Sequence, residues 1–507
     1  MTSRFLFVAI GIVVLGTTMK VPAAETEQKL PNIVVIYTDD IGYADVGCYG
    51  AAGVNTPHID RLATEGLRFT DAHCSAATCT PSRFALLTGS YAFRQKGTGV
   101  LSGDAAMIIR PGTATMPSLL KSVGYTTAVV GKWHLGLGNG KNNWNGRLEP
   151  GPEAIGFDYH FLIPATGDRV PCVYVEDNYV VGADPSDPIY TSYGKPIGDD
   201  PTGKDHPELL KQRWSHGHNA TIINGISRIG FMQGGNRARW VDEEMADTIT
   251  EKAVQFIKQH RQQPFFLYFC THDIHVPRVP HQRFQGISSM GFRGDAIAQL
   301  DWCVGKLLET LDELEVADNT LVLFTSDNGP VLDDGYHDLA NERIGRHHPA
   351  GPFRGGKYSP FEGGTRVPLI VRWPGHVPTG DESSALVGQI DFARSLAQLV
   401  GADVPDDAVR DSRNQLDALL GRDPVGRPHL IHEAGTLALR QAHWKYIPPC
   451  KPRDGLGPWQ PTEIAAPGAL FDLRNDPGEQ LNLAMQHPQQ LRDMADLLAR
   501  LRADADQ

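Results

Sequence analysis

The segment CTPSRFALLTG, residues 79–89, places the thiol of Cys79 at the predicted start of a helix. Pro81 suits the first turn of that helix, and residues 83–87 suit its body. A helix N-terminus attracts anions and lowers the pKa of a thiol, so a cysteine nucleophile is one possible chemistry. The oxygen-rich metal site described next gains little from sulfur, because hard metal ions prefer oxygen. The sequence therefore indicates that Cys79 is converted into an oxygen nucleophile.

Acidic residues follow two strand-like runs at the point where each run ends. Asp39 and Asp40 end NIVVIYTDD, and Asp327 and Asn328 lie in TSDNG after a second apolar run. Carboxylate and amide oxygens suit Ca²⁺ or Mg²⁺ rather than zinc. Either pair alone could be a turn or a helix cap. Two pairs at equivalent strand ends favour a site for one divalent ion, with Ca²⁺ expected and Mg²⁺ as the alternative.

Basic residues fall beside the same strands. Lys132 and His134 lie in GKWHLG, His275 lies in THDIHVP, and Lys357 lies in RGGKYSP. One lysine on a loop is usually a solvated charge. Gathered with Arg83 at one sheet edge, these side chains would form a pocket for a tetrahedral oxyanion.

The elements that must position these residues are strands that alternate with helices. Apolar strand-like runs lie at residues 32–40, 127–136, 264–277, 319–329 and 366–375, and amphipathic helical patterns lie at residues 241–260 and 295–315. Continuous apolar strands alternating with helices predict an α/β fold with a mostly parallel sheet. Ligands bind at the carboxyl edge of such sheets, where the polar residues above gather.

The chain is expected to contain a signal peptide and two further parts. Residues 1–23 combine Arg4, an apolar run and Ala23 before a cleavage point, which predicts export to the periplasm or the medium. The apolar run is too short for a membrane anchor, so no stable membrane insertion is expected. A catalytic domain is expected over residues 24–375, with a loop-rich insertion at about 167–240. A smaller C-terminal subdomain is expected over residues 376–507, with a terminal helix near residues 487–502.

Composition and charge restrict the partners. With 41% hydrophobic and 21% charged residues the chain has an ordinary globular composition. Its formal charge is -12, and loss of Arg4 and Lys20 with the signal peptide would make it -14. A negative chain does not bind nucleic acid through its overall field, so an anionic substrate needs local positive charge. Seven cysteines leave at least one thiol unpaired in an exported protein.

The residues quoted above resemble a known family. Cys79, Pro81, Ser82 and Arg83, followed by LTG at residues 87–89, are similar to the C-x-P-S-R-x-x-x-L-T-G signature of type I sulfatases, in the alkaline phosphatase superfamily. The stretches PNIVVIYTDDIGYADVGCYG, GKWHLG, TSDNG, GGKYSPFEGGTRVPLIVRWPG and LFDLRNDPGEQLNL follow in the family's order. The resemblance implies an alkaline-phosphatase-like sandwich, with a large, mostly parallel central sheet flanked by helices and a smaller C-terminal α+β subdomain.

The resemblance also implies a role for each candidate residue. A maturation enzyme would oxidise Cys79 to Cα-formylglycine (3-oxoalanine), whose hydrated form attacks sulfur. Asp39, Asp40, Asp327 and Asn328 would hold one divalent ion, and Arg83 would hold the hydrated nucleophile. Lys132 and Lys357 would bind sulfate oxygens. His275 would protonate the departing alcohol, and His134 would hold the second oxygen of the nucleophile.

The substrate is predicted from a less specific pattern. Residues 342–357 form a basic segment, which is either a solvated loop or a collar that selects an anionic glycan. Asp333, Asp334 and Tyr336 could bind a sugar, and His216, His218 and Arg228 are further candidates from the insertion. The predicted substrate-binding residues are Asp333, Asp334, Tyr336, Arg343, Arg346, His347, His348 and Arg354. The arrangement resembles carbohydrate sulfatases that act on sulfated galactose or N-acetylgalactosamine units.

Two other functions are compatible with the sequence. One is a phosphodiesterase or phosphonate monoester hydrolase of the same superfamily, and the other is an inactive glycan-binding relative. Every catalytic position is filled, which favours the active enzyme. The sequence does not specify the sugar, the sulfate position, exo or endo action, or the oligomeric state.

Overall fold

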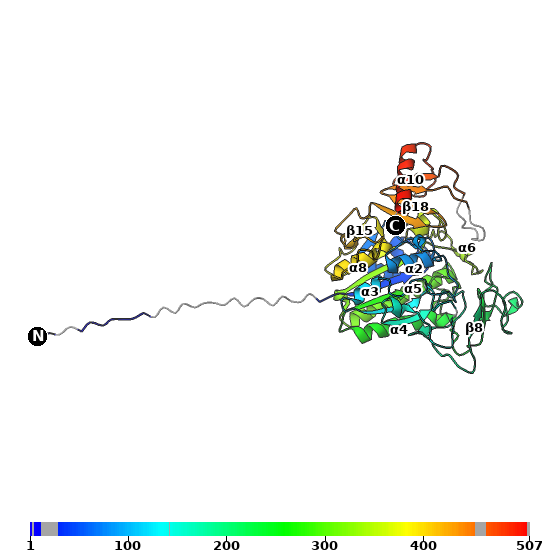
Figure 1. Ribbon diagram of the computed structural model, residues 1–507, viewed down its shortest axis with the longest axis horizontal. Helices are drawn as coiled ribbons and strands as arrows, with labels where there is room; N and C mark the ends of the chain where they lie inside the picture. The colour runs from blue at the N-terminus through cyan, green and yellow to red at the C-terminus, as the bar shows by residue number, and fades with distance from the viewer. Residues whose placement is uncertain (3–4, 12–28, 141, 452–462, 504–507) are drawn as a thin grey trace. The chain divides into compact units, whose positions relative to one another are not determined.

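The computed structural model covers residues 1–507 and describes all of them except 3–4, 12–28, 141, 452–462 and 504–507 (Figure 1). The chain divides into two units, Met1–Leu30 and Pro31–Gln507. The described residues of the first unit contain no helix or strand. Most of the expected signal peptide lies outside the described residues. Among the described helices, none has the length and apolar character needed to span a bilayer.

A ten-stranded sheet forms the centre of the second unit. Its order is β15 (Asp381–Ser383), β2 (Leu67–Phe69), β14 (Leu369–Arg372), β13 (Thr320–Ser326), β1 (Asn32–Thr38), β12 (Phe265–Cys270), β4 (Thr126–Lys132), β5 (Tyr159–Ile163), β6 (Val175–Glu176) and β7 (Tyr179–Val180). The five strands from β13 to β5 are parallel to one another, and the strands on either side of them, β14 and β6, pair antiparallel. The α/β fold predicted from the alternating pattern is therefore confirmed.

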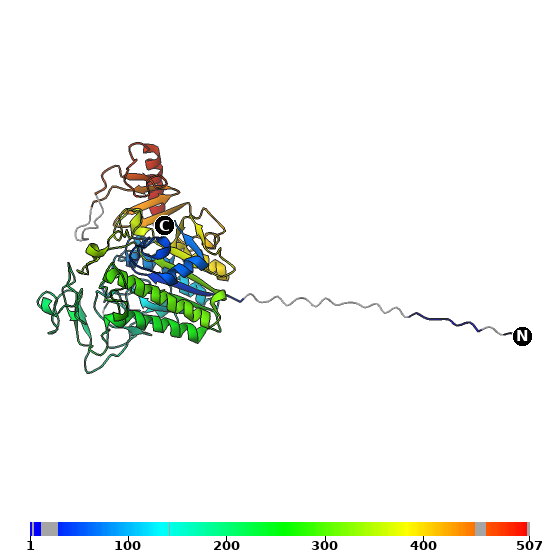
Figure 2. The same ribbon diagram turned by 180° about the vertical axis from the view of Figure 1, so that it is seen from behind.

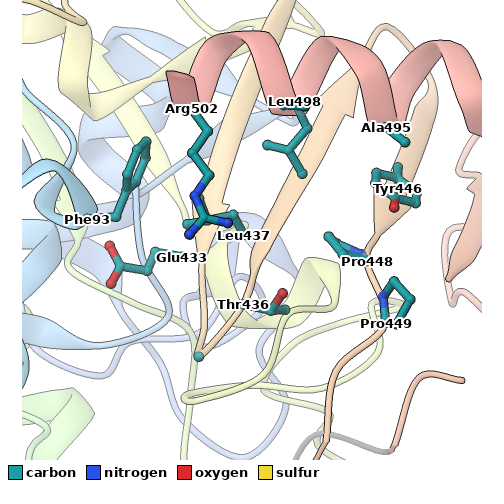
Figure 3. Close-up of a pocket in the computed structure, with 12 residues that line it drawn as sticks. Phe93, Glu433, Thr436, Leu437, Tyr446, Pro448, Pro449, Ala495, Leu498 and Arg502 are labelled. Carbon is teal, nitrogen blue, oxygen red and sulfur yellow. The ribbon is translucent and has the colours of Figure 1, made fainter. Parts of the chain in front are cut away.

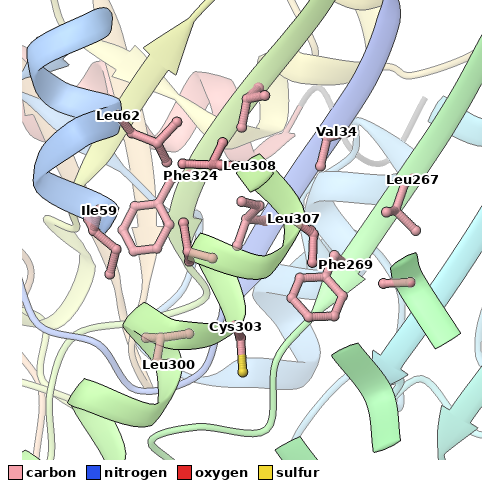
Figure 4. Close-up of a cluster of buried hydrophobic side chains, with 14 of the residues drawn as sticks. Val34, Ile59, Leu62, Leu267, Phe269, Leu300, Cys303, Leu307, Leu308 and Phe324 are labelled. Atoms are coloured by element: carbon pink, nitrogen blue, oxygen red, sulfur yellow. The ribbon is translucent and has the colours of Figure 1, made fainter. Parts of the chain in front are cut away.

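The central strands are buried on both faces, which explains their continuous apolar sequences. On one face, Val34 and Leu267 pack against Leu300 and Leu307 of α5 (Phe292–Glu313), as Figure 4 shows. Helices α1 (Pro57–Glu65) and α4 (Met245–His260) complete this layer, and Figure 2 shows α4 beside α5.

The other face carries shorter helices. Tyr37 of β1 points to this face, where its ring lies 5.1 Å from the guanidinium of Arg83 in α2 (Cys79–Thr88). Helices α3 (Met116–Lys121) and α8 (Phe392–Val400) contact each other and α2 (Figure 1). Two helical layers thus enclose the sheet, and α2 brings the N-terminal end of a helix to its carboxyl edge.

The C-terminal region contains a separate antiparallel sheet. Its order is β17 (His429–Glu433), β18 (Leu437–Gln441), β19 (Trp444–Ile447) and β20 (Ala469–Asp472), and α10 (Pro488–Ala503) packs on β18 and β19. The terminal helix predicted near residues 487–502 is confirmed. β15 pairs with β2 of the large sheet, and α8 packs on α2 and α3, although both elements follow residue 376.

Short elements fill the remaining connections. The region 167–240 contains the strand pairs β8 (Tyr190–Ser192) with β11 (Phe231–Gln233) and β9 (Ile222–Ile223) with β10 (Ile226–Ser227). The other short elements are β3 (Ala72–His73), β16 (Val387–Gly388), α6 (Ala340–Arg343), α7 (Glu362–Thr365) and α9 (Leu416–Leu419).

Candidate active site

The four predicted metal ligands meet at the carboxyl edge of the sheet. Thr38 and Ser326 are register partners at the ends of β1 and β13, so Asp39 and Asp327 leave the sheet side by side. The Asn328 amide donates to Asp40 Oδ1 at 2.7 Å, and all four side chains are fully buried. Oδ1 of Asp39 and Oδ1 of Asn328 have no hydrogen-bond partner among the described residues. Buried oxygens without partners are costly, so this donor set fits a hard divalent cation.

Three cationic side chains surround these acids. Lys132 Nζ lies 2.5 Å from Asp39 Oδ2, and the Arg83 guanidinium lies 2.9 Å from Asp327 Oδ2. Lys357 Nζ lies 2.9 Å from Asp40 Oδ1. Burial alone would raise the pKa of Asp40, but Lys357 and Lys132 outweigh it and hold that pKa below its usual value. The site therefore keeps negative charge for a metal and positive charge for an anion in one buried cluster.

The position of Lys132 depends on the glycine before it. Gly131 has a φ of +108°, and a Cβ atom there would lie 1.8 Å from the carbonyl oxygen of Cys270 in β12. Only glycine allows this close approach of the two strands. Gly131 thus allows β4 to pair with β12 while Lys132 turns toward Asp39.

Cys79 is the first residue of α2 and is 1% exposed. It lines a cavity of about 200 Å³ together with His275, Asp334 and Lys357. Burial raises the pKa of its thiol, although Lys132 and Lys357 oppose the shift. The helix start therefore does not produce the low-pKa thiolate that the sequence allowed as one alternative. All seven cysteines are described, and none forms a disulfide.

In each of the two predicted catalytic histidines, a hydrogen bond to a backbone carbonyl determines which ring nitrogen carries a proton. His275 Nδ1 donates to Val276 O at 2.7 Å, which leaves Nε2 directed at Asp40 and Asp334, each 4.0 Å away. His134 Nε2 donates to Leu101 O at 3.0 Å, and its buried Nδ1 has no partner among the described residues. Burial, with Lys357, lowers the pKa of His275. Each ring thus presents one nitrogen that can accept a proton.

The cavity contains polar residues that the sequence analysis did not select. Asp168 and Arg169 line it and lie 2.8 Å apart, and Tyr358 lines it with its hydroxyl on Asp334. Asp168 and Arg169 follow β5 at the same sheet edge as Asp39 follows β1. The pattern used for Asp39 and Asp327 does not select them, because β5 is not among the strands predicted from the sequence and Asp168 does not directly follow it.

The two histidines suggested from the insertion line the cavity, whereas the arginine does not. His216 and His218 are lining residues. The ring of His218 lies between two acceptors, with Nε2 at 2.8 Å from Asp168 Oδ2 and Nδ1 at 2.7 Å from His216 O. Arg228 is buried and pairs with Asp242 at 2.7 Å.

Of the eight predicted substrate-binding residues, only Asp334 lines the cavity, where it accepts from Lys357 Nζ at 2.7 Å. Tyr336 is buried, donates to Ser227 O and packs against His218. Asp333 accepts from Ser215, and Arg354 lies 3.9 Å from the ring of Phe361. The exposed residues of the predicted collar, none of which lines this cavity, are Arg343, Arg346 and His348.

His347 has a different place from the one predicted. It is buried, and its Nε2 lies 2.8 Å from Asp45 Oδ1. Asp45 also forms two hydrogen bonds of 2.7 Å with the guanidinium of Arg293 in α5. His347 therefore belongs to a buried ion-pair network that ties its loop to α5, and the prediction of a substrate contact is corrected because the side chain is not accessible.

The ion pairs of Asp45 lead to a prediction of how the free energy of unfolding changes at low pH. Burial acts to raise the pKa of Asp45, but Arg293 and His347 outweigh it and lower that pKa to about 2. The unfolded value is about 3.9, so the stabilisation is fully present above about pH 4 and is lost as the pH falls toward 2. Denaturant unfolding of the wild type should lose about 2 kcal/mol more across this range than unfolding of Asp45→Asn. Equal losses in the two proteins would contradict this assignment.

The arrangement defines a class of hydrolase for oxyanion esters: oxygen ligands and cations at a sheet edge, with a reactive position at a helix start. A family model described as Sulfatase matches residues 31–402, so the chain belongs to the sulfatase family. The protein is a sulfuric ester hydrolase with an alkaline-phosphatase-like fold, as the sequence predicted.

Three relatives show how far the similarity extends. An N-acetylgalactosamine-6-O-sulfatase of Bacteroides thetaiotaomicron is 51% identical over 98% of this chain and 98% of its own length. A human N-acetylgalactosamine-6-sulfatase is 33% identical, covering 82% of this chain and 71% of its own. A solved structure from work on the metabolism of multiple glycosaminoglycans by Bacteroides thetaiotaomicron is 51% identical, with a TM-score of 0.91 over 94% of this chain and 100% of its own.

Proposed function

We propose that this sulfatase removes the 6-O-sulfate of N-acetylgalactosamine, or of the related galactose unit, in a sulfated glycan. One observation carries the proposal: a single cavity contains both Cys79 with Lys357 and a group of polar side chains suited to a sugar. The 51% identical relative named for this activity supports the sugar and the position.

The donor set supports the expected cofactors. Formylglycine formed from Cys79, with one divalent ion, proposed as Ca²⁺, would supply an oxygen nucleophile and the charge that activates it. Asp39, Asp40, Asp327 and Asn328 would hold the ion, and the unpaired oxygens of Asp39 and Asn328 support this role. Arg83 would hold the nucleophile from within α2.

The remaining catalytic residues act on the sulfate and on the leaving group. Lys132 and Lys357 would bind sulfate oxygens and stabilise the charge that builds up during transfer. His275 keeps one proton on Nδ1, so a proton held on Nε2 would pass to the departing sugar oxygen and leave the sugar as its free alcohol. His134 Nδ1 would accept a proton from the nucleophile.

The sugar would be held on the other side of the cavity. Asp168 offers carboxylate acceptors, Arg169 offers donors, and His218 adds an imidazole ring bonded to Asp168. Burial makes such polar contacts selective, because a sugar that leaves them unpaired loses binding energy. This set, with Asp334, takes the place of the exposed basic collar as the proposed source of specificity.

A substrate panel tests the proposal. Sulfate release should be fastest from N-acetylgalactosamine 6-sulfate, at least about a hundredfold faster in kcat/KM than from N-acetylgalactosamine 4-sulfate and from N-acetylglucosamine 6-sulfate. Ion chromatography of released sulfate measures all three. A phosphate diester and a phosphonate monoester in the same panel test the superfamily alternative. Equal rates on the three sulfated sugars would contradict the substrate, and preference for phosphorus esters would contradict the chemistry.

Export, maturation and the division into domains are proposed from the sequence. We propose export to the periplasm or medium after removal of residues 1–23, and activation by a formylglycine-generating enzyme that acts on CTPSR at residues 79–83. We also propose the division into residues 24–375 and 376–507, which the separate sheet of β17 to β20 supports.

A further inference from the structure

Two further cavities form a row with the catalytic cavity. The second, of about 250 Å³, shares Val100 and Tyr358 with the catalytic cavity. The third, of about 510 Å³, shares Glu433 and Gly435 with the second. Shared lining residues place the three in a row that leads from Cys79 to the C-terminal sheet and α10.

The third cavity, shown in Figure 3, lies between α10 and the four-stranded sheet. Phe93, Tyr446 and Leu498 give it apolar and aromatic surfaces. Tyr446, Thr436 and Arg502 also line it, and the side chains of these three residues have no hydrogen-bond or ion-pair partner among the described residues. Apolar surface with a few unpaired polar groups is the usual composition of a ligand site.

The size of the catalytic cavity explains why a glycan would need this path. About 200 Å³ is below the range of roughly 300–1,000 Å³ that is typical of ligand pockets, so it suits one sulfated sugar unit. The units attached to that sugar must leave the cavity. The adjoining cavities provide a route lined by Tyr358, Lys451 and then the aromatic and polar groups of the third cavity.

We propose that the second and third cavities bind the sugar units attached to the sulfated sugar, so that the preferred substrate is an oligosaccharide rather than a monosaccharide. The inference rests on the proposed function and adds a role for the C-terminal subdomain. Tyr446 and Phe93 would contact sugar faces, while Thr436 and Arg502 would bind hydroxyls and carboxylates.

The experiment compares kcat/KM for a sulfated hexasaccharide and for the corresponding sulfated monosaccharide. In the wild type, the hexasaccharide should be favoured by at least about tenfold. Ala499→Trp places a large side chain in the third cavity from the exposed side of α10 and should remove most of this preference. Arg502→Ala should reduce it for a uronate-containing hexasaccharide.

Arg500→Ala provides the matched control. Arg500 and Arg502 are both exposed residues of the last turn of α10, but only Arg502 lines the cavity. The control should keep the wild-type preference. Equal kcat/KM on both substrates in the wild type, or an unchanged preference in Ala499→Trp, would overturn the proposal.

A binding measurement separates this proposal from the proposed function. Calorimetry with Cys79→Ala protein should show tighter binding of the sulfated hexasaccharide than of the monosaccharide, and Ala499→Trp in the same background should remove the difference. If no sulfated sugar is hydrolysed by wild-type protein, the proposed function fails, and the calorimetric comparison still decides the subsites. Tight binding of an apolar probe such as a fatty acid in the third cavity, without hexasaccharide binding, would also overturn the proposal.

Discussion

Cys79→Ala is expected to abolish sulfate release, with kcat reduced by at least about a thousandfold. The substitution removes the thiol whose oxidation would give the proposed formylglycine, and no other thiol lines the cavity of about 200 Å³. Cys79 occupies a buried helix start, where alanine fits without adding volume, so the fold should persist. Turnover of a sulfated sugar and the melting temperature test the two parts of this prediction.

Cys303→Ala is the control for loss of a buried thiol. Cys303 is also 1% exposed, but it lies in α5 within the core on the opposite face of the sheet (Figure 4). It should reduce stability by about 1 kcal/mol through the lost burial and leave kcat near the wild-type value. The mass of the peptide containing residue 79 should show an aldehyde in active protein. An unmodified thiol in fully active protein would refute the formylglycine mechanism.

The clustering of the candidate catalytic residues could be predicted because their positions follow from the direction of the strands. Asp39, Lys132 and Asp327 come directly after or at the end of parallel strands, and a parallel sheet brings such positions to one edge. The sequence at each strand end was therefore enough to predict which residues, far apart in the chain, lie close together. The same rule does not select Asp168, because a loop separates it from the end of β5 and the sequence predicts no strand at residues 159–163.

The residues of the predicted basic collar do not lie together at the cavity, because the composition of a loop does not specify which of its side chains are buried. Arg343, His347 and Arg354 are close in sequence, but one is exposed, one pairs with buried Asp45 and one stacks on Phe361. The position of each side chain depends on residues far away in the sequence. Arg293 binds Asp45, the partner of His347, and the backbone of Glu479 accepts a hydrogen bond from Arg354. Periodicity places the residues of helices and strands, but no comparable rule exists for an irregular segment of this length.

Tyr336 and Asp334 show that even residues close together in the sequence can have different environments in the fold. Tyr336 is separated from Asp334 by one residue, yet its ring is buried under His218 while Asp334 faces Lys357. A sugar-stacking role was predicted from residue type alone. In the fold, the phenol is buried and packs against the His218 ring, and residue type alone does not indicate this position.

Asp39→Asn is expected to remove bound metal and to reduce activity by at least about a hundredfold. The amide keeps the size of the side chain and an oxygen toward Lys132, but it removes the charge from the oxygen set that a divalent cation requires. Metal content by mass spectrometry should fall from about one calcium per chain to nearly none. After chelation, added Ca²⁺ should raise the melting temperature of the wild type but not that of the variant.

Asp301→Asn distinguishes loss of a ligand from loss of any buried carboxylate. Asp301 is buried and accepts from the backbone of His58 and Ile59 at the start of α1, away from the strand ends. This variant should lose stability because its cap is weakened, while it keeps its calcium and its kcat. Retention of calcium in Asp39→Asn would show that the carboxylate serves only to pair Lys132. Loss of calcium in both variants would show that metal content follows folding, so the assignment of Asp39 depends on the difference between the two.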